Sequence, residues 1–282
     1  MNANQTLHLQ EAGGEAKKNG IILEMAGINR YDRVHVIANT KPFFLREGST
    51  IEDAVYKIIQ TGHRSIPVVN KKHHLIGIVT TPDILNAFLK NQNFRDKITS
   101  IMTRDVIFVH HDDPIGLAIQ KMKISRRGRL PILKKKKLVG IVSEYDVIKY
   151  FAHRELLVKV SDVMTRKPFF IPHTMSLFDV LRILTNTKYR RLPVVENGKV
   201  IGIVTASDIL KYLRNSDFST SDLFHPVDSL LRKKVFSVDK HKDLSEAIRK
   251  MLVHNVSGLL VLEEGDKLEG IITERDIINQ IV

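Results

Sequence analysis

The chain has no cysteine and no tryptophan among its 282 residues, and it has no long apolar run. Without cysteine there is no disulfide, no thiol nucleophile and no zinc site built on thiolates. Because no apolar stretch approaches 18 residues, no transmembrane helix is predicted. Residues 1–10 lack the basic and apolar regions of a signal peptide, so we expect a cytoplasmic protein with no membrane partner.

Signatures of catalysis are missing as well. The chain contains no glycine-rich phosphate loop, no nucleophile elbow and no His-Glu-x-x-His motif. His73-His74 and His110-His111 are adjacent pairs, and neighbouring side chains do not face one ligand on a helix or a strand. We therefore expect no enzyme, no catalytic residue, no catalytic cofactor and no metal site; any enzyme that the chain regulates would be a separate protein.

Positive charge, by contrast, is abundant. The chain has 44 Lys and Arg against 31 Asp and Glu, a formal net charge of +13. Such a balance favours partners that carry phosphate, although a solvated basic surface would give the same composition. The run Lys134 to Lys137 lies between two apolar stretches, where a hairpin turn belongs, and a solvated turn is favoured there over a binding patch.

A glycine followed three residues later by Thr/Ser-x-x-Asp occurs four times. The glycines are Gly77, Gly140, Gly202 and Gly270, with spacings of 63, 62 and 68 residues. A period of this size indicates one supersecondary unit copied four times. Units of about 60 residues bury little surface alone, so we expect them to pack in pairs.

The copies also group into two halves. Lys41-Pro42-Phe43-Phe44 returns as Lys167-Pro168-Phe169-Phe170, and residues 65–69 resemble residues 191–195, both at an offset of 126. The join lies near residues 151–157. Residues 1–30 are polar, contain glycine and sustain no period, which predicts a flexible or loosely attached tail.

Each unit has the order strand–helix–strand–strand–helix, an α/β (α+β) arrangement. In the second unit, residues 106–109 predict a strand, and Asp113-Pro114 opens a helix with Ile115, Ala118, Ile119 and Met122 at helical spacing. Residues 130–133 and 138–142 predict two further strands. Ser143 then caps the last helix.

Thr/Ser-x-x-Asp has two readings. It is a capping-box pattern for the start of a helix, and a single copy would indicate only a cap. Four copies, each with Asp rather than the longer Glu or Gln, favour a ligand contact in addition to the cap. A carboxylate can accept hydrogen bonds from two vicinal hydroxyls, and free N–H groups at a helix start attract anions. A sugar diol with a phosphate fits this chemistry.

Taken together, these residues resemble the CBS-domain family (cystathionine β-synthase domains). The resemblance rests on the Gly-to-Asp run, on the Leu/Ile-Pro-Val strand before it, and on Met102-Thr103 and Met164-Thr165 near repeat starts. It implies four CBS repeats in two Bateman modules that form a flat disc, similar to the γ subunit of AMP-activated protein kinase and its archaeal relatives. The implied divisions are a tail at 1–30 and repeats at 31–90, 98–152, 158–214 and 220–282.

The resemblance also implies site residues. The ribose of an adenosine ligand would be held by Thr80, Asp83, Ser143, Asp146, Thr205, Asp208, Thr273 and Asp276. The base would lie against a wall of Phe44, Ser65, Ile66, Val106, Leu130, Phe170 and Leu192. Phosphates would be held by His63, Arg64, Arg129, Arg190 and Arg191. In repeat 4, Leu259 replaces the strand proline and no Arg precedes it, so the Thr205/Asp208 cleft is predicted to bind phosphates least.

The function that follows is a regulatory, nucleotide-binding module that binds AMP, ADP or ATP and controls a separate protein target in energy sensing; the target is unidentified, and a homodimer is allowed. One alternative is a binder of S-adenosylmethionine or methylthioadenosine, which need no phosphate cations. Another is a nucleic-acid-binding protein, although aromatic residues make up only 6% of the chain. A purely structural scaffold is the last. The arginines before the strand prolines favour adenine nucleotides.

Overall fold

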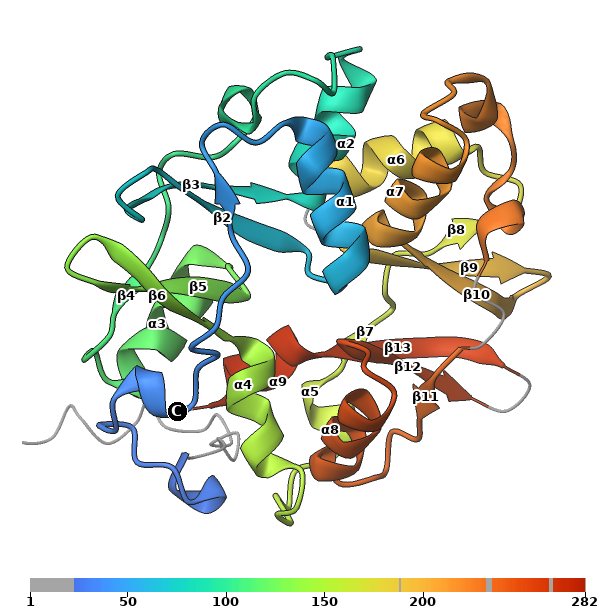
Figure 1. Cartoon of the computed structure of the whole chain (residues 1–282). Coiled ribbons are helices and arrows are strands. Elements are labelled where there is room, and N and C mark those ends of the chain that lie inside the picture. Colours follow the sequence, from blue (N-terminus) through green and yellow to red (C-terminus); the bar gives the residue numbers. More distant parts are fainter. Residues whose placement is uncertain (1–22, 188, 232–234, 264–265, 282) are drawn as a thin grey trace, which may run out of the picture.

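The computed structural model describes residues 23–281 except residues 188, 232–234 and 264–265. The predicted order strand–helix–strand–strand–helix is present in all four repeats, and the fold is a mixed α+β fold. Figure 1 shows the four repeats arranged around a common centre, so that the molecule is a disc of two halves.

The first half contains repeats 1 and 2. Repeat 1 consists of β1 (Leu45–Arg46), α1 (Ile51–Thr61), β2 (Ser65–Val69), β3 (Leu75–Thr80) and α2 (Thr81–Leu89). Repeat 2 consists of β4 (Val109–His110), α3 (Ile115–Ser125), β5 (Arg129–Lys134), β6 (Lys137–Ser143) and α4 (Glu144–Ile148). A 3₁₀ turn over Lys149–Phe151 continues α4, and other 3₁₀ turns cover Leu23–Ala26, Val34–Val36 and Ile98–Ser100.

The second half contains repeats 3 and 4. Repeat 3 consists of α5 (Val160–Val163), β7 (Thr165–Arg166), β8 (Ile171–Pro172), α6 (Leu177–Asn186), β9 (Arg191–Glu196), β10 (Lys199–Thr205) and α7 (Ala206–Asn215). Repeat 4 consists of β11 (Ser237–Val238), α8 (Leu244–Val253), β12 (Gly258–Glu263), β13 (Lys267–Thr273) and α9 (Glu274–Gln280). Two 3₁₀ turns, Ser221–Phe224 and Val227–Leu230, connect them.

Every repeat builds its sheet in the same way. The short first strand pairs in parallel with the second, through a crossover that contains the first helix, and the second and third strands form an antiparallel hairpin. In the second half, β10 and β13 pair, so the strands join into one sheet with the order β11-β12-β13-β10-β9-β8, and β7 pairs with β13. In the first half the sheets β1-β2-β3 and β4-β5-β6 stay separate, and an isolated bridge between His74 and Lys137 links them.

Helices join the two halves. One hydrophobic core combines repeats 1 and 3, with Val55 and Leu85 packed among residues such as Leu184 and Leu210. The other combines repeats 2 and 4, with Phe151 packed among residues such as Ile278. Figure 1 shows α1, α2, α6 and α7 together on one side and α4, α8 and α9 on the other. Within the described residues, no helix has the length and apolarity needed to cross a bilayer.

Two details differ from the sequence-based expectations. The first strand of repeat 2 begins at Val109 rather than at residue 106, and the carbonyl of Phe108 accepts a hydrogen bond from Lys121 Nζ at 2.9 Å instead of joining a ladder. The predicted tail is shorter than 30 residues, because Leu23, Ala26 and Ile28 are buried in the core of repeats 2 and 4. Residues 1–22 lie outside the described part of the chain.

Candidate functional site

The last helix of each repeat begins at one of the four predicted hydroxyl–aspartate pairs. In all four, Asp Oδ2 accepts the backbone N–H of the hydroxyl residue at 2.8–3.0 Å. The side-chain hydroxyl also donates to Oδ2, at 2.6 Å in every copy. The capping half of the prediction is thus confirmed, with the helix starts held by Thr80/Asp83, Ser143/Asp146, Thr205/Asp208 and Thr273/Asp276.

This geometry divides the work between the two carboxylate oxygens. Because Oδ2 closes the cap, Oδ1 is the oxygen that can have partners outside the cap. Asp146 Oδ1 lies 3.5 Å from Lys149 Nζ, and Asp276 Oδ1 accepts from Thr165 Oγ1 at 3.2 Å. The threonine or serine hydroxyl already donates its hydrogen bond to Oδ2, so toward a ligand it can act only as an acceptor. Each pair therefore suits a group that donates hydrogen bonds, such as a ribose diol, better than it suits a phosphate.

The same pattern also caps two helices elsewhere. Thr50/Asp53 opens α1 with a complete capping box. At the start of α6, Ser176 Oγ donates to Asp179 Oδ2 and accepts the Asp179 N–H, but the Ser176 N–H does not take part. Both of these aspartates are exposed, whereas the four predicted ones are partly or fully buried. Burial and position, rather than the pattern itself, distinguish the candidate ligand-binding pairs.

Charged side chains from all four repeats gather at the centre of the disc. We call this group the central arginine cluster. It consists of Arg64, Arg129, Arg190, Arg191, Arg275, Glu144, Glu274 and Ser257. The predicted phosphate cations Arg64, Arg129, Arg190 and Arg191 are therefore brought together in space, although they come from three different repeats.

Hydrogen bonds inside the cluster cross from one half of the molecule to the other. Ser257 Oγ accepts from Arg64 Nη2 at 2.6 Å and also from Arg191 Nη2. Arg275 Nε lies 2.5 Å from Glu144 Oε1, which connects repeats 4 and 2. One serine hydroxyl of repeat 4 thus contacts arginines of repeats 1 and 3.

The cluster carries more positive than negative charge. Burial lowers the pKa of the Arg64, Arg129 and Arg191 guanidiniums, that of Arg191 to about 9, and neighbouring arginines add to the effect. Burial likewise raises the pKa of Glu144 and Glu274. Five arginines lie among two glutamates, and the capping aspartates Asp146, Asp208 and Asp276 add negative charge beside them. Arg190 is exposed. Guanidiniums that converge from different repeats can donate to one anion, so this centre is suited to an anion.

Two glycines make room for the cluster. A Cβ atom at Gly258 would collide with Arg191 Nη1, and one at Gly128 would lie 2.7 Å from Glu144 Oε2. In the strand registers Gly258 pairs with Thr273, as Arg129 pairs with Ser143 and Arg191 with Thr205. Leu260, rather than the predicted Leu259, is therefore at the position of the strand proline, and repeat 4 has a glycine where repeats 2 and 3 have an arginine. The missing side chain at Gly258 admits the arginine of repeat 3.

The predicted base-wall residues are more dispersed. The side chains of Ile66, Leu130 and Leu192 are fully buried in the two hydrophobic cores. Phe44 packs beside His73, with ring centroids 4.7 Å apart, and Phe170 is about half exposed. Ser65 and Val106 are partly exposed. A base wall made of these side chains stays a prediction.

His63 has other contacts in this structure, and its role in binding phosphate stays a prediction. Its Nδ1 lies 3.0 Å from the Thr61 carbonyl oxygen, and its ring meets Phe43 edge-on. The residues that sequence reasoning missed are Glu144, Glu274 and Arg275, whereas the resemblance implied that Ser257 faces Thr205 and Asp208. One signal was available for the two glutamates, because both directly follow the cap hydroxyl in repeats 2 and 4, while repeats 1 and 3 have Thr81 and Ala206 there.

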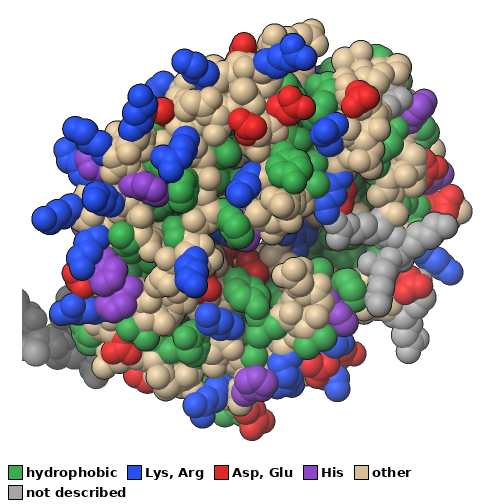
Figure 2. Space-filling model, viewed as in Figure 1, with side chains coloured by type: hydrophobic (Ala, Val, Ile, Leu, Met, Phe, Trp, Pro, Cys, Tyr) green, Lys and Arg blue, Asp and Glu red, His purple; other side chains and the backbone are tan. Residues whose placement is uncertain are grey.

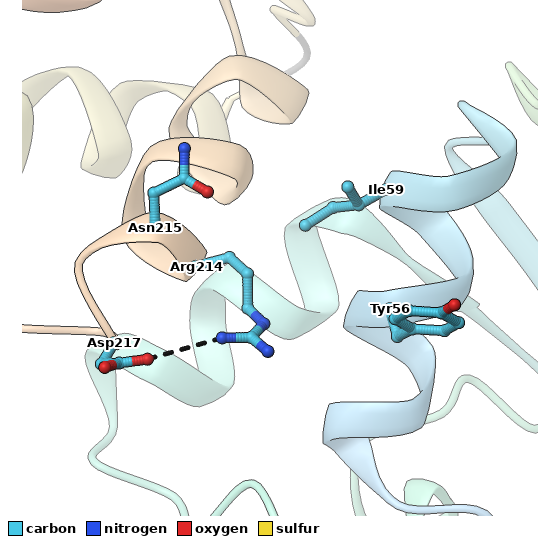
Figure 3. Close-up of a pocket in the computed structure, with 5 residues that line it drawn as sticks. All are labelled: Tyr56, Ile59, Arg214, Asn215 and Asp217. Atoms are coloured by element: carbon cyan, nitrogen blue, oxygen red, sulfur yellow. Dashed lines mark hydrogen bonds and ion pairs between the residues drawn. The ribbon is translucent and has the colours of Figure 1, made fainter.

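A groove of about 430 Å³ lies elsewhere, between α1 and α7. Figure 3 shows its lining, with Tyr56 and Ile59 on one side and the ion pair Arg214–Asp217 (3.5 Å) on the other. It is at the C-terminal end of α7, whereas Thr205 and Asp208 are at the beginning of that helix. The groove is therefore separate from the capping pairs.

One histidine cluster was not foreseen. His35 from the N-terminal segment stacks on His111, with ring centroids 4.1 Å apart and planes 8° apart, and Asp112 lies beside them. The ligand atoms of these three residues lie within 4.8 Å of one another, a spacing that could hold a metal ion, and Asp112 is also paired with Arg33 at 2.9 Å. The expectation of no metal site stays a prediction.

Asp83 offers a test of burial at a capping pair. Burial raises the pKa of its carboxyl, opposed by hydrogen bonds from Thr80. The folded protein therefore holds this proton more tightly than the unfolded chain, and stability falls as pH rises from about 3.9 through the raised value. Asp83→Asn keeps an oxygen for the cap and does not titrate. We expect its Tm relative to wild type to increase between about pH 3.5 and pH 7. A relative Tm that decreases over this range would contradict the assignment, and Asp53→Asn serves as the exposed control.

Comparison with known proteins places these features in a family. The family model for the CBS domain matches residues 34–90, 98–153, 160–215 and 227–282. An uncharacterized 33.4 kDa protein in a ribosomal RNA operon of Thermofilum pendens is 29% identical over 258 residues, 83% of this chain and 85% of that protein. Protein MJ1225 of Methanocaldococcus jannaschii is 26% identical over 279 residues, 87% of this chain and 98% of that protein.

Solved structures have the same architecture. The crystal structure of MJ1225, described as a proposed archaeal homologue of γ-AMPK, matches with a TM-score of 0.80 and 24% identity, over 88% of this chain and 99% of that chain. A conserved protein from Pyrococcus horikoshii matches with a TM-score of 0.63 and 25% identity, over 89% and 100%. The arrangement of four repeats in two halves is thus shared by archaeal proteins of similar length.

Proposed function

The chain belongs to the CBS-domain family, and from that premise we propose that it binds adenine nucleotides between its repeats and regulates a separate protein. The observation that carries the proposal is the convergence of Arg64, Arg129 and Arg191, whose guanidiniums are desolvated and come from different repeats. Adenosine compounds with one to three phosphates bring both the hydroxyl donors that the capping pairs can accept and the phosphate oxygens to which these arginines can donate.

The ribose would be held by the aspartates of the capping pairs. Each Asp Oδ1 can accept from the two vicinal hydroxyls, while the neighbouring Thr or Ser oxygen accepts from either of them. Asp146 and Asp208 lie close enough to Arg129 and Arg64 to influence their pKa values, and Asp276 does the same for Arg191. A nucleoside at these aspartates would therefore have its phosphates within reach of the cluster.

Phosphates would be held by arginines. The planar guanidinium can donate to two phosphate oxygens at once, which makes arginine the better residue for this role. Arg64, Arg129 and Arg191 come from different repeats, so a phosphate bound among them would contact both halves of the disc. Arg64 and Arg191 also donate to Ser257 of repeat 4. The prediction that the Thr205/Asp208 cleft binds phosphates least is tested by measuring the occupancy of each cleft.

Regulation would follow from linkage. A nucleotide that binds only one arrangement of the halves stabilises that arrangement, by about 2.7 kcal/mol at a hundredfold excess over Kd. If additional phosphates change how closely the arginines of opposite halves approach, a partner protein can distinguish AMP from ATP by shape. S-adenosylmethionine would satisfy the ribose sites but has no phosphate to which the arginines of the cluster could donate, which is why we place it second.

The proposal is tested with a ligand panel. We expect AMP, ADP and ATP to raise Tm by roughly 5–10 °C at a hundredfold excess over Kd, and titration calorimetry should give weaker binding for adenosine and for S-adenosylmethionine. Absence of a Tm shift with every adenylate would refute the function. Equal affinity for adenosine and ATP would refute the role of the arginine cluster.

A further inference from the structure

A second concentration of positive charge lies at the rim of the disc. The hairpin turn between β2 and β3 and the turn between β5 and β6 are side by side there, since Leu75 N–H donates to the Lys136 carbonyl and Leu138 N–H to the His73 carbonyl, both at 3.2 Å. We call this surface the basic rim. It consists of Lys71, Lys72, His73, His74, Lys134, Lys135, Lys136 and Lys137.

The basic rim is exposed and has no acidic residue within its two turns. All six lysines are exposed, and both histidines are partly exposed. Figure 2 shows Lys, Arg and His side chains along the side of the molecule where Figure 1 places these hairpins. Six lysine charges thus face solvent together without a counter-ion in the same turns.

The corresponding turns of the second half have a different character. The β9–β10 turn reads Glu196-Asn197-Gly198-Lys199 where the β5–β6 turn reads four lysines. The β12–β13 hairpin adds exposed Glu263 and Asp266 beside its own lysine. The repeat architecture therefore does not require a basic turn, and the charge of the turns differs between the two halves.

The backbone conformation of Lys135 is one that lysine seldom adopts. Lys135 adopts a positive φ of 57°, a conformation that suits Gly or Asn in a hairpin turn. In the equivalent turn of repeat 3, this is the conformation of Asn197 (φ 49°) and Gly198 (φ 78°). Repeat 2 thus has a lysine where another residue would be more stable locally, so local stability does not account for its presence.

The surroundings of the rim narrow the kind of partner. The apolar side chains beneath it include Val69, Leu133 and Leu138, which are at most 7% exposed, and the partly buried Phe44, Leu75 and Phe108. Lysines rather than apolar side chains therefore project from the rim. None of the residues that line the groove between α1 and α7 belongs to the rim. What remains is an open row of cations, which fits a polymer of regularly spaced phosphates.

We propose that the basic rim binds the phosphate backbone of a nucleic acid, at a site separate from the central arginine cluster. Lysines contact such a backbone without reading sequence, and binding is driven largely by release of counter-ions. The sequence alone favoured a solvated turn for Lys134 to Lys137; the contact with the second basic turn, which is 62 residues away in the chain, changes that interpretation.

The test uses fluorescence anisotropy of the full chain with a labelled single-stranded RNA and, in a second arm, a labelled DNA duplex. We expect affinity to fall steeply with salt. In Lys134→Glu/Lys135→Asn, which copies the residues of repeat 3, affinity should fall about tenfold or more and the salt slope by about 2. Lys71→Gln/Lys72→Gln, in the other turn, should act in the same direction.

A charge-matched control separates the rim from net charge. The exchange variant combines Lys134→Glu/Lys135→Asn with Glu196→Lys/Asn197→Lys, which keeps the formal charge of +13 but moves two lysines to the opposite rim. We expect it to bind as weakly as the rim variant. Wild-type affinity in the exchange variant, or no salt-dependent binding of either nucleic acid, would overturn the proposal.

Two further readouts make the result specific. Vesicles that contain phosphatidylserine should not compete for the labelled probes; equal competition would assign the rim to membranes and overturn the proposal. Tm and the adenylate-induced Tm shift should be unchanged in the rim variants, because Asn tolerates the backbone of residue 135. If instead the variants lose nucleic-acid binding only in step with a lost adenylate shift, the two sites are not separate and the inference fails.

Discussion

Arg191→Met is expected to remove phosphate-dependent binding while the ligand-free protein stays folded and at least as stable as wild type. Arg191 sits in the central arginine cluster with its guanidinium desolvated, and burial together with Arg64 lowers its pKa to about 9. Arg64 and Arg190 add like charge beside it, which Glu274 and Asp276 oppose. Without a ligand, replacing a charge of this kind by an apolar side chain of similar length is often neutral or stabilising.

When a nucleotide is bound, the same substitution becomes unfavourable. A hydrogen bond from arginine to phosphate contributes about 1.5–3 kcal/mol, so the variant should bind AMP and ATP about tenfold to hundredfold more weakly. Adenosine, which has no phosphate, should bind the variant and the wild type alike. Calorimetry with the three ligands and the Tm of the ligand-free proteins provide the measurement.

Arg95→Met is the control for this prediction. Arg95 is exposed in the link between repeats 1 and 2, so its replacement changes net charge equally but leaves the cluster intact. A ligand-free Arg191→Met protein that is several degrees less stable than wild type would show that the guanidinium is already well paired. A similar loss of affinity in Arg95→Met would show that net charge, rather than the cluster, attracts the nucleotide.

Asp146→Asn/Asp276→Asn is expected to have the opposite ligand profile. In each residue Oδ2 serves the cap, and asparagine keeps one oxygen for that role while it replaces the other by an NH₂ donor. The helix starts should therefore persist. The acceptor for the ribose diol is lost, so adenosine, AMP and ATP should all bind about tenfold to hundredfold more weakly.

The capping box at the start of α1, outside the site, allows a matched control. Asp53→Asn makes the same chemical change at the start of α1, where the aspartate is exposed, and it should leave every affinity unchanged. Thermal unfolding of the ligand-free variants checks that the caps survive. If the double variant retains full affinity for adenosine, the hydroxyl–aspartate pairs are helix caps only.

The sequence predicts well the features that a single repeat contains. The order of elements and the caps follow from residues close to one another in the chain, such as Ser143 and Asp146. Local patterns do not show where a capping pair lies in the fold. Thr50/Asp53 has the same pattern, and the sequence does not distinguish its exposed position from a central one. Burial at each box is decided by which repeats pack together.

The central arginine cluster is harder to predict because it depends on contacts between distant residues. Ser257 is 193 residues away from Arg64 in the chain, and nothing near either residue indicates the hydrogen bond. The sequence alone places Leu259 at the position of the strand proline, whereas the strand register puts Leu260 there and Gly258 at the position of Arg191 in repeat 3. The small size of Gly258 matters only because the guanidinium of Arg191 occupies the space that a side chain would need.

The way the hydrophobic cores are shared has an evolutionary consequence. Each core takes half of its side chains from repeats 1 and 2 and half from repeats 3 and 4, so neither half alone has a complete interior. A shorter ancestor that encoded one half would have buried its apolar helix faces by self-association, with two copies related by a twofold axis. Gene duplication and fusion would then have fixed that pairing in one polypeptide, after which each side was free to diverge.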